Sequence, residues 1–444
     1  MSEQENQLTS MRNFLIIWVG QIVSVLGSEM TNFAITIWAW ELTGLATPLS
    51  LIFFFTYTPK VIAASFAGLL VDRWHRQRLM MLGDAAAGFS TIAILLLFLT
   101  NQLQIWHIYV TVAINGLFGY VQLLAFSASM SMLVPKQHYA RATAMGEYIT
   151  YSSSYIIAPA LAGALYYQIG LAGILAIDVI TCAIAVTSIS IGTIAQPLAS
   201  QFSSLSHNLF EDLTFGFRYL FQRPSLLAIL IFWLCFHLFD YAGLAIFRPM
   251  ILARSGSNAG VLASVQFALG TGGFIGAVLL TIWGGHKRRI HGLLLGTALM
   301  CLGKVMLGLG QLPWSWMAAG FLAGFFSPAI DSSNQTIWLS KVEPDVQGRV
   351  FASRFLIAQI TTPLGLAVGG PLADYLFEPA MRTGGSLVGS LGAVFGSGFG
   401  AGMALQFTLF SFCSFLIGLG GYAFPVLRDV EDMVPDHDAA ASID

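Results

Sequence analysis

Several ionisable side chains lie inside long apolar stretches of the sequence, where a charge is energetically expensive. Glu29, Lys60, Asp240 and Asp331 each fall within such a stretch. A carboxyl group buried in a medium of low dielectric constant binds and releases protons near neutral pH. These four residues are therefore candidates for proton binding and for polar contact with a ligand. For Glu29 and Asp240 the alternative is a structural pair or cap, and Lys60 is a candidate partner of Glu29.

Uncharged polar residues and three further charges occupy the same kind of stretch. Asn115, Gln122 and Asn334 are candidates to line a polar cavity with the four residues above. Asp84 and Asp178 lie nearer the ends of their apolar stretches, so a structural role is expected for them. Lys304 needs a partner that the sequence does not identify, or must extend its side chain toward water.

The composition defines the elements that must position these residues. The chain has 444 residues, of which 56% are hydrophobic and 9% charged, with a mean hydropathy of +0.74. Soluble domains are about 25% charged, so the composition excludes a soluble protein. The length suits about twelve membrane-spanning helices of ~20 residues. The four cysteines lie far apart within apolar stretches and predict neither a disulfide framework nor a metal site.

Twelve apolar runs follow one another along the chain, with a polar break in the middle. The expected fold is an all-α membrane protein with two pseudo-symmetric six-helix bundles, at residues 1–195 and 226–427. A cytoplasmic linker at 196–225 and an acidic cytoplasmic tail at 428–444 complete the expected organisation. The expected spans are 14–40, 49–71, 79–99, 106–133, 144–167, 171–194, 226–252, 261–283, 293–310, 314–339, 350–377 and 400–424.

A dense group of charges separates the second span from the third. The stretch GLLVDRWHRQR covers residues 68–78, and we call it the charged loop. Its residues of interest are Gly68, Asp72, Arg73, Arg76 and Arg78. A short basic loop keeps its side of the membrane cytoplasmic. It is also a candidate gate, in which Asp72 faces the start of a helix or pairs with an arginine. Separately, Gly68 is expected to let the helices approach closely.

The lysines and arginines predict the orientation. With a cytoplasmic N-terminus, fifteen of the 20 fall in inner loops and tails, three fall outside, and two lie within spans. This asymmetry predicts an even number of spans and cytoplasmic termini, in the plasma (inner) membrane of the cell.

Two connecting segments carry their own patterns. Apolar residues in the break at 196–225 form one stripe of a short amphipathic helix, expected to lie on the cytoplasmic leaflet and to link the two halves. A simple linker is the alternative. The last outer loop, residues 378–399, is rich in glycine and serine. It is expected to be either a mobile flap or, slightly favoured, a loosely packed connector.

The charged loop resembles the G-x-x-x-D-R-x-x-R signature of the major facilitator superfamily, which joins helices 2 and 3 of that family. The fifth span resembles the G-P-x-x-G-G pattern of superfamily exporters, written here as A-P-A-L-A-G at 158–163. A kinked helix with a small-residue face would let one half rock against the other. The residues assigned to this interface are Ser154, Pro159, Gly163 and, in the eleventh span, Pro363.

Further stretches resemble the macrolide-efflux and siderophore-exporter branch of that family. They include QIVSVLGSEMTNFAITIWAWELTG in the first span and QGRVFASRFLIAQITTPLGLAVGGPLAD in the eleventh. The resemblance implies proton-driven efflux of lipophilic drugs, macrolide-like compounds, siderophores or other secondary metabolites by an antiporter of drug-resistance type. Its partners would be an amphipathic small molecule, protons and the lipid bilayer, and it would act as a monomer. The arginine that proton-coupled drug exporters often carry in helix 4 is absent.

Other functions remain open at the level of sequence. A transporter or flippase of lysophospholipids is one alternative, and a non-transporting sensor or scaffold with the same fold is another. No phosphate-binding glycine loop, metal-ligand spacing or nucleophile elbow occurs, so neither an enzyme nor a cofactor is expected. No basic, aromatic-rich stripe predicts binding to nucleic acid.

Overall fold

The computed structural model describes residues 3–134, 142, 152–192, 209–434 and 436, and their regular structure is helical. Inside a bilayer the backbone finds no water to bond, so a helix, which satisfies its N–H and C=O groups internally, is the expected solution for apolar spans. Contacts between residues divide the chain into two units. The first comprises residues 1–44, 51–204 and 258–267, and the second comprises 45–50, 205–257 and 268–444.

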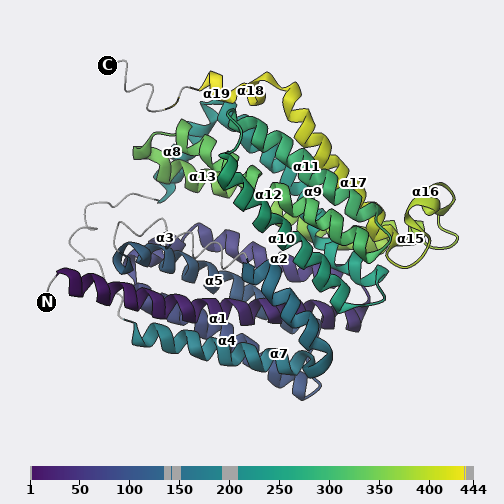
Figure 1. The fold of residues 1–444 in the computed structure, drawn as a ribbon, viewed down its shortest axis with the longest axis horizontal. Coiled ribbons are helices and arrows are strands. Elements are labelled where there is room, and N and C mark those ends of the chain that lie inside the picture. The colour runs from purple at the N-terminus through teal and green to yellow at the C-terminus, as the bar shows by residue number, and fades with distance from the viewer. Residues whose placement is uncertain (1–2, 135–141, 143–151, 193–208, 435, 437–444) are drawn as a thin grey trace. The chain divides into compact units, whose positions relative to one another are not determined.

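The helices of the first half of the chain follow the expected spans (Figure 1). They are α1 (Glu3–Thr43), α2 (Ala46–Ala64), α3 (Ala67–Arg73), α4 (Arg76–Leu99), α5 (Ile105–Leu133), a π-helical turn (Ser153–Ile157) and α7 (Ala158–Ile191). Gly170 breaks α7 with φ 64° and ψ −173°, a conformation that favours glycine. The break separates the fifth expected span from the sixth.

The helices of the second half begin with α8 (Leu209–Phe221), which precedes the remaining spans. They continue with α9 (Pro224–Arg254), α10 (Ala259–Trp283), α11 (Arg289–Leu309), α12 (Pro313–Lys341), α13 (Gln347–Gln359), α14 (Thr362–Leu372), a π-helical turn (Ala373–Phe377), α15 (Glu378–Met381), α16 (Val388–Phe395), α17 (Ala401–Gly420), α18 (Pro425–Arg428) and α19 (Val430–Met433).

The described helices cover all or part of each of the twelve expected spans, and residues 144–151 and 193–194 of the fifth and sixth spans lie outside the described residues. Nine described helical segments are long and apolar enough to cross a membrane. One of them, Ser153–Ile191, holds two expected spans on either side of the break at Gly170. The second and tenth expected spans correspond to α2 with α3 and to α12.

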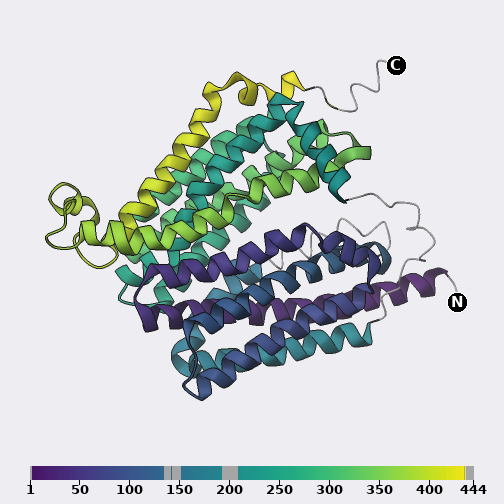
Figure 2. The ribbon, with the colours of Figure 1, turned by 180° about the vertical axis from the view of Figure 1, so that it is seen from behind.

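Small residues let the helices of the first unit pack closely. Helix α1 packs along α7, and α4 packs on both α7 and α5, an arrangement visible from both sides in Figures 1 and 2. A Cβ atom at Gly20 would lie 2.0 Å from the hydroxyl of Ser188. One at Gly27 would lie 2.1 Å from the hydroxyl of Thr181. Such contacts bring the polar side chains of α1, α4 and α7 within hydrogen-bonding distance.

Helices α9 and α14 of the second unit meet in the same way. A Cβ atom at Gly365 would lie 2.7 Å from the carbonyl oxygen of Leu238, and one at Gly369 would lie 2.6 Å from that of Ala242. The two glycines are four residues apart and therefore share a face of α14. The small face expected in the eleventh span thus packs on α9 of its own unit.

A π-helical turn precedes a proline in each half of the chain. Ser153–Ile157 comes before Pro159, and Ala373–Phe377 comes before Pro379. Proline has no N–H and its ring crowds the preceding turn, which widens the helix. This confirms the irregular helix expected at the fifth span and adds a second one.

The amphipathic helix α8 packs on protein. Leu220 and Tyr219 are buried in the core of the second unit. A Cβ atom at Gly216 would lie 2.2 Å from the hydroxyl of Ser353 in α13. The close approach to α13 covers this face of the helix, while Phe221 stays exposed. The expected contact with the cytoplasmic leaflet stays a prediction.

The outer loop is attached to the helices of the second unit. Residues 388–395 form α16, and Phe395 is buried. The Arg254 side chain donates to the carbonyl oxygens of Gly308 and Gly310, at 3.1 and 2.9 Å, and also to that of Phe395. The Gln311 amide donates to the carbonyl oxygen of Val394. These bonds favour the connector over the mobile flap.

Candidate functional site

The charges of the first unit that the sequence singles out act on one another. The carboxylate of Glu29 in α1 interacts electrostatically with Lys60 in α2, although no contact between these two described side chains is short enough for an ion pair. The Lys60 ammonium also lies 5.2 Å from the ring centre of Tyr57, one turn earlier. Both side chains are partly buried. This arrangement supports Glu29 as the partner of Lys60.

Gln122 belongs to a closed polar ring with two other helices. Its Nε2 donates to Oδ1 of Asp84 at 2.8 Å and to Oε1 of Gln21 at 2.9 Å. Nε2 of Gln21 in turn donates to Oδ2 of Asp84 at 2.7 Å. The ring joins α1, α4 and α5. Sequence reasoning missed Gln21. The available signal was a polar residue in an apolar helix, two turns before Ser28 and therefore on the same face.

Asp178 of α7 lies in the same packing of helices. The hydroxyl of Ser28 donates to its Oδ1 at 3.1 Å, and the hydroxyl of Thr91 donates to its Oδ2 at 2.8 Å. Asp178 and Asp84 are both only 3% exposed. The structural role expected for them is compatible with these contacts.

Asn115 lies in α5 with its Oδ1 atom buried and, among the described residues, without a hydrogen-bond partner. The neighbouring Gly116 approaches α2 so closely that a Cβ atom there would lie 2.3 Å from the carbonyl oxygen of Thr56. A buried amide oxygen without a partner is unusual and leaves an acceptor free for a ligand or water.

In the second unit Asp240 and Lys304 form an ion pair. Oδ1 of Asp240 in α9 lies 2.5 Å from Nζ of Lys304 in α11, and the side chains are 18% and 21% exposed. The partner that Lys304 requires is therefore Asp240. Two predicted charges thus meet across two helices of the same unit.

His237 lies three residues before Asp240 on α9 and shares its side of the helix. Its Nδ1 lies 2.9 Å from the carbonyl oxygen of Ala358 in α13, and because a carbonyl only accepts, Nδ1 carries the proton. Its ring packs against Trp233 and Tyr241, with centres 4.9 and 5.3 Å away. Sequence reasoning missed this residue, and a histidine in an apolar run was the available signal.

The other two polar residues of the second unit lie in α12 and differ in environment. Oδ1 of Asn334 accepts from the indole N–H groups of Trp233 and Trp338, at 3.1 and 3.2 Å. These bonds fix its amide as a link between α9 and α12. Asp331, one turn earlier, is exposed on a face of α12 that its own unit leaves uncovered.

The charged loop is attached to α5 through Arg76. Nη1 of Arg76 donates at 2.6 Å to the carbonyl oxygen of Ala128 near the end of α5, and Arg76 is buried. Arg73 and Arg78 are exposed, and the Asp72 side chain lies outside the described part of the chain. A Cβ atom at Gly68 would meet no described atom within 4 Å. The close approach expected at Gly68 is therefore wrong in this structure, because the residue faces open space.

The residues assigned to the interface helices lie at irregular points. Ser154 is in the π-helical turn, and Pro159 is buried in the first turn of α7. A Cβ atom at Gly163 would lie 2.6 Å from that of Ala263, a residue that also belongs to the first unit. Pro363 lies in the first turn of α14, where its missing N–H leaves no bond unmade.

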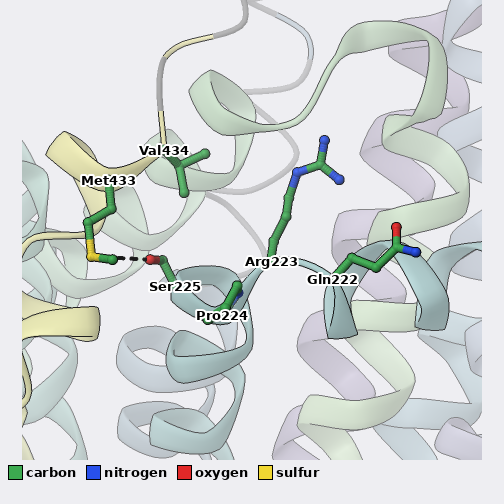
Figure 3. A pocket seen from close by; sticks show the side chains of 6 residues that line it. All are labelled: Gln222, Arg223, Pro224, Ser225, Met433 and Val434. Atoms are coloured by element: carbon green, nitrogen blue, oxygen red, sulfur yellow. Dashed lines mark hydrogen bonds between the residues drawn. The ribbon is translucent and has the colours of Figure 1, made fainter.

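A small cavity lies where the start of α9 meets the end of the chain. It has a volume of about 270 Å³ and is lined by Gln222, Arg223, Pro224, Ser225, Met433 and Val434. Figure 3 shows the Ser225 hydroxyl directed at the Met433 thioether.

The arginine of this cavity is already engaged. Arg223 lies 3.3 Å from Glu343 and stacks on the ring of Tyr219 at 3.5 Å. Burial, together with the hydrogen bond to Glu343, raises the pKa of the Tyr219 phenol. The cavity therefore lacks a free charge for a ligand.

Among the described residues, no group of three histidine, cysteine, aspartate or glutamate side chains is arranged to hold a metal ion. The chemistry that the arrangement offers is therefore that of buried carboxyl groups: ion pairing, hydrogen bonding and proton exchange.

Known proteins resemble this chain over most of its length. Residues 17–366 match the family model of the Major Facilitator Superfamily. Macrolide efflux protein A of Streptococcus pyogenes is 28% identical over 369 residues, covering 81% of this chain and 89% of that protein. The multidrug efflux pump Tap of Mycolicibacterium fortuitum is 22% identical over 377 residues, covering 81% and 89%.

Solved structures share the fold at low sequence identity. A bacterial homologue of the human lysosomal transporter Spinster has a TM-score of 0.63 and 15% identity, covering 93% of this chain and 97% of that one. The nucleoside transporter NupG has a TM-score of 0.63 and 11% identity, covering 92% and 98%. With a family match over residues 17–366 and helices that follow the expected spans, the chain belongs to the Major Facilitator Superfamily and is a multi-pass membrane transporter, not an enzyme.

Proposed function

We propose that this protein exports lipophilic small molecules in exchange for protons. The proposed substrates are drugs, macrolide-like compounds, siderophores and other secondary metabolites. Support comes from two relatives whose names describe macrolide efflux and multidrug efflux. The protein acts as a monomer in the plasma membrane. Both termini lie in the cytoplasm, in line with the distribution of its lysines and arginines.

The observation that carries the proposal is the ion pair of Asp240 and Lys304 within the membrane-spanning helices of the second unit. In the first unit Glu29 acts on Lys60 electrostatically, without a direct contact between the two described side chains. Charges inside a membrane are expensive and mark substrate or ion pathways. A carboxylate paired with an ammonium also couples protonation to movement of the lysine. When the carboxylate binds a proton, the attraction that holds the lysine is lost.

The transport cycle exposes the binding site to one side of the membrane at a time. Glu29 or Asp240 takes up a proton from outside, and the paired lysine is released. The carboxyl group discharges its proton to the cytoplasm after the substrate has left. The proton gradient thereby drives export.

The test is uptake of labelled dyes, macrolides and catecholate siderophores into inverted membrane vesicles, with and without an imposed proton gradient. We expect gradient-dependent uptake of at least one class by the wild type. At least one of the variants Glu29→Gln and Asp240→Asn should lose the stimulation by the gradient. The matched control is Asp345→Asn, since Asp345 is an exposed carboxylate outside the expected spans. This control variant should keep the stimulation by the gradient.

Full gradient-driven uptake by both carboxyl variants would overturn the proposed coupling. An absence of uptake under every condition would overturn export of these compounds. A lysophospholipid translocation assay would then test the lipid alternative.

A further inference from the structure

Two buried aspartates of the first unit lie among neutral groups. Asp84 in α4 and Asp178 in α7 are each 3% exposed. The hydrogen bonds that described side chains make to their carboxyl oxygens come from two glutamines, a serine and a threonine. An ionised carboxylate inside a membrane without a cationic partner is costly, so each group must either be compensated by donors or carry a proton.

The ring around Asp84 is satisfied in full by the ionised carboxylate, which accepts both amide hydrogen bonds and needs no acceptor for a carboxyl proton. Its three contacts join Gln122 to Gln21, Gln21 to Oδ2, and Gln122 to Oδ1. All three are satisfied when both amides donate to Asp84. If the amide nitrogen and oxygen of Gln21 alone are exchanged, two nitrogens meet between the glutamines. If those of Gln122 alone are exchanged, two oxygens meet there. Reversing both places an amide oxygen against each carboxyl oxygen, and a single proton on Asp84 repairs only one of those contacts.

The surroundings of Asp178 fit both protonation states. The hydroxyls of Ser28 and Thr91 donate to an ionised carboxylate, as described above. A hydroxyl also accepts, so after rotation either one takes a hydrogen bond from a protonated Asp178. No hydrogen bond is lost in either state.

A third hydroxyl adds to this environment. The side chain of Thr31 is 5% exposed, and its hydroxyl faces the Asp178 carboxyl group. Because a hydroxyl both donates and accepts, Thr31 is a third group that can adapt to either protonation state of Asp178.

One nearby charge acts in the same direction. Glu29 of α1 exerts a like-charge interaction on Asp178. Nearby negative charges favour the protonated form of a carboxyl group. Glu29 is partly exposed and is the neighbour with which a proton on Asp178 can exchange.

We propose that Asp178 is the proton-binding residue within the helix packing of the first unit, while Asp84 stays ionised as a fixed charge. This inference rests on the proposed proton-coupled export. Asp84 and Asp178 are equally buried. The proton is assigned to Asp178 because its hydroxyl neighbours can donate or accept, whereas the amide neighbours of Asp84 donate to an ionised carboxylate.

The test is the infrared spectrum of the purified full chain in liposomes, recorded for wild type, Asp178→Asn and Asp84→Asn at neutral pH. The difference between wild type and Asp178→Asn should contain the C=O band of a protonated carboxylic acid. The difference between wild type and Asp84→Asn should contain a carboxylate band instead. Asp178→Glu should retain an acid band, because it restores a titratable group.

Thr91→Val provides a second measurement if Asp178→Asn does not fold. It should shift the acid band, since one hydrogen bond to that group is removed. A carboxylate band from Asp178, an acid band from Asp84, or an acid band that Thr91→Val leaves in place would overturn the inference.

The spectrum separates this inference from the proposed function. It reports protonation without any transport substrate. Gradient-driven export without an acid band from Asp178 would contradict only the inference. An acid band from Asp178 in a protein that transports none of the tested compounds would contradict only the proposed function.

Discussion

At the scale of single residues, the ion pair of Asp240 and Lys304 joins the two helices α9 and α11. The atoms are 2.5 Å apart, and most of each side chain is covered. Removal of one partner leaves the other charge unpaired in an apolar environment. Removal of both charges takes away the attraction and the desolvation penalty together.

We predict that Asp240→Asn and Lys304→Met each lower the free energy of unfolding by about 3–5 kcal/mol. The double variant should recover most of that loss, because no unpaired charge remains. The measurement is the thermal midpoint of the purified protein in detergent. Equal losses that add in the double variant would show that the two side chains do not stabilise one another.

At the scale of helices, the glycine face of α14 sets its distance from α9. Gly369 faces the backbone of Ala242, which has no flexible end that could move aside. We predict that Gly369→Ala separates the two helices and lowers stability by about 1–3 kcal/mol. The measurement is again the thermal midpoint.

Gly348 of α13 is the matched control for this substitution. A Cβ atom there meets no described atom within 4 Å, so Gly348→Ala should leave the midpoint unchanged or raise it slightly, because alanine favours a helix. If both variants behaved alike, close packing at Gly369 would not be the reason for its glycine.

Residues 431–434 and 436 are held to the start of α11 and the end of α12. Lys341, the last residue of α12, is 5% exposed. Its ammonium donates to the carbonyl oxygens of Glu431 and Val434 and pairs with Asp436 at 2.8 Å. The Glu431 carboxylate accepts from the backbone N–H of Ile290 in the first turn of α11. The tail therefore supplies the acceptors for a buried ammonium.

We predict that deletion of residues 431–444 lowers the thermal midpoint, since it leaves Lys341 without these acceptors. Adding Lys341→Met to the deletion should restore part of the loss. Deletion of residues 437–444 alone is the control, because it keeps every acceptor named above. A midpoint that is insensitive to the longer deletion would contradict this role of the tail.

At the scale of the whole molecule, the orientation in the membrane follows from the basic residues. We predict that a membrane-impermeant maleimide labels Ser397→Cys in intact cells, in a variant without the four native cysteines. Lys287→Cys should react only after permeabilisation. Both side chains are exposed in the structure, so a difference in labelling reports the side of the membrane. The reverse pattern would invert the proposed topology.

The sequence by itself determined the spans, their expected orientation and the presence of charges inside them. These properties are local, because a run of about 20 apolar residues spans a bilayer wherever it occurs, and a charge within it stands out. The proline of the fifth span likewise marked irregular helix geometry in advance, since a missing N–H acts at its own position.

Only the tertiary structure decided which polar groups meet. Asp240 and Lys304 are 64 residues apart, and Asp178 and Ser28 are 150 apart. A helix that is apolar on every side carries no periodic pattern that predicts which face turns toward a neighbour. The rotation of each helix is instead set by close packing, as at Gly20, Gly27 and Gly369. That packing gave Asp84 amide neighbours and Asp178 hydroxyl neighbours, because the partners of both groups come from other helices.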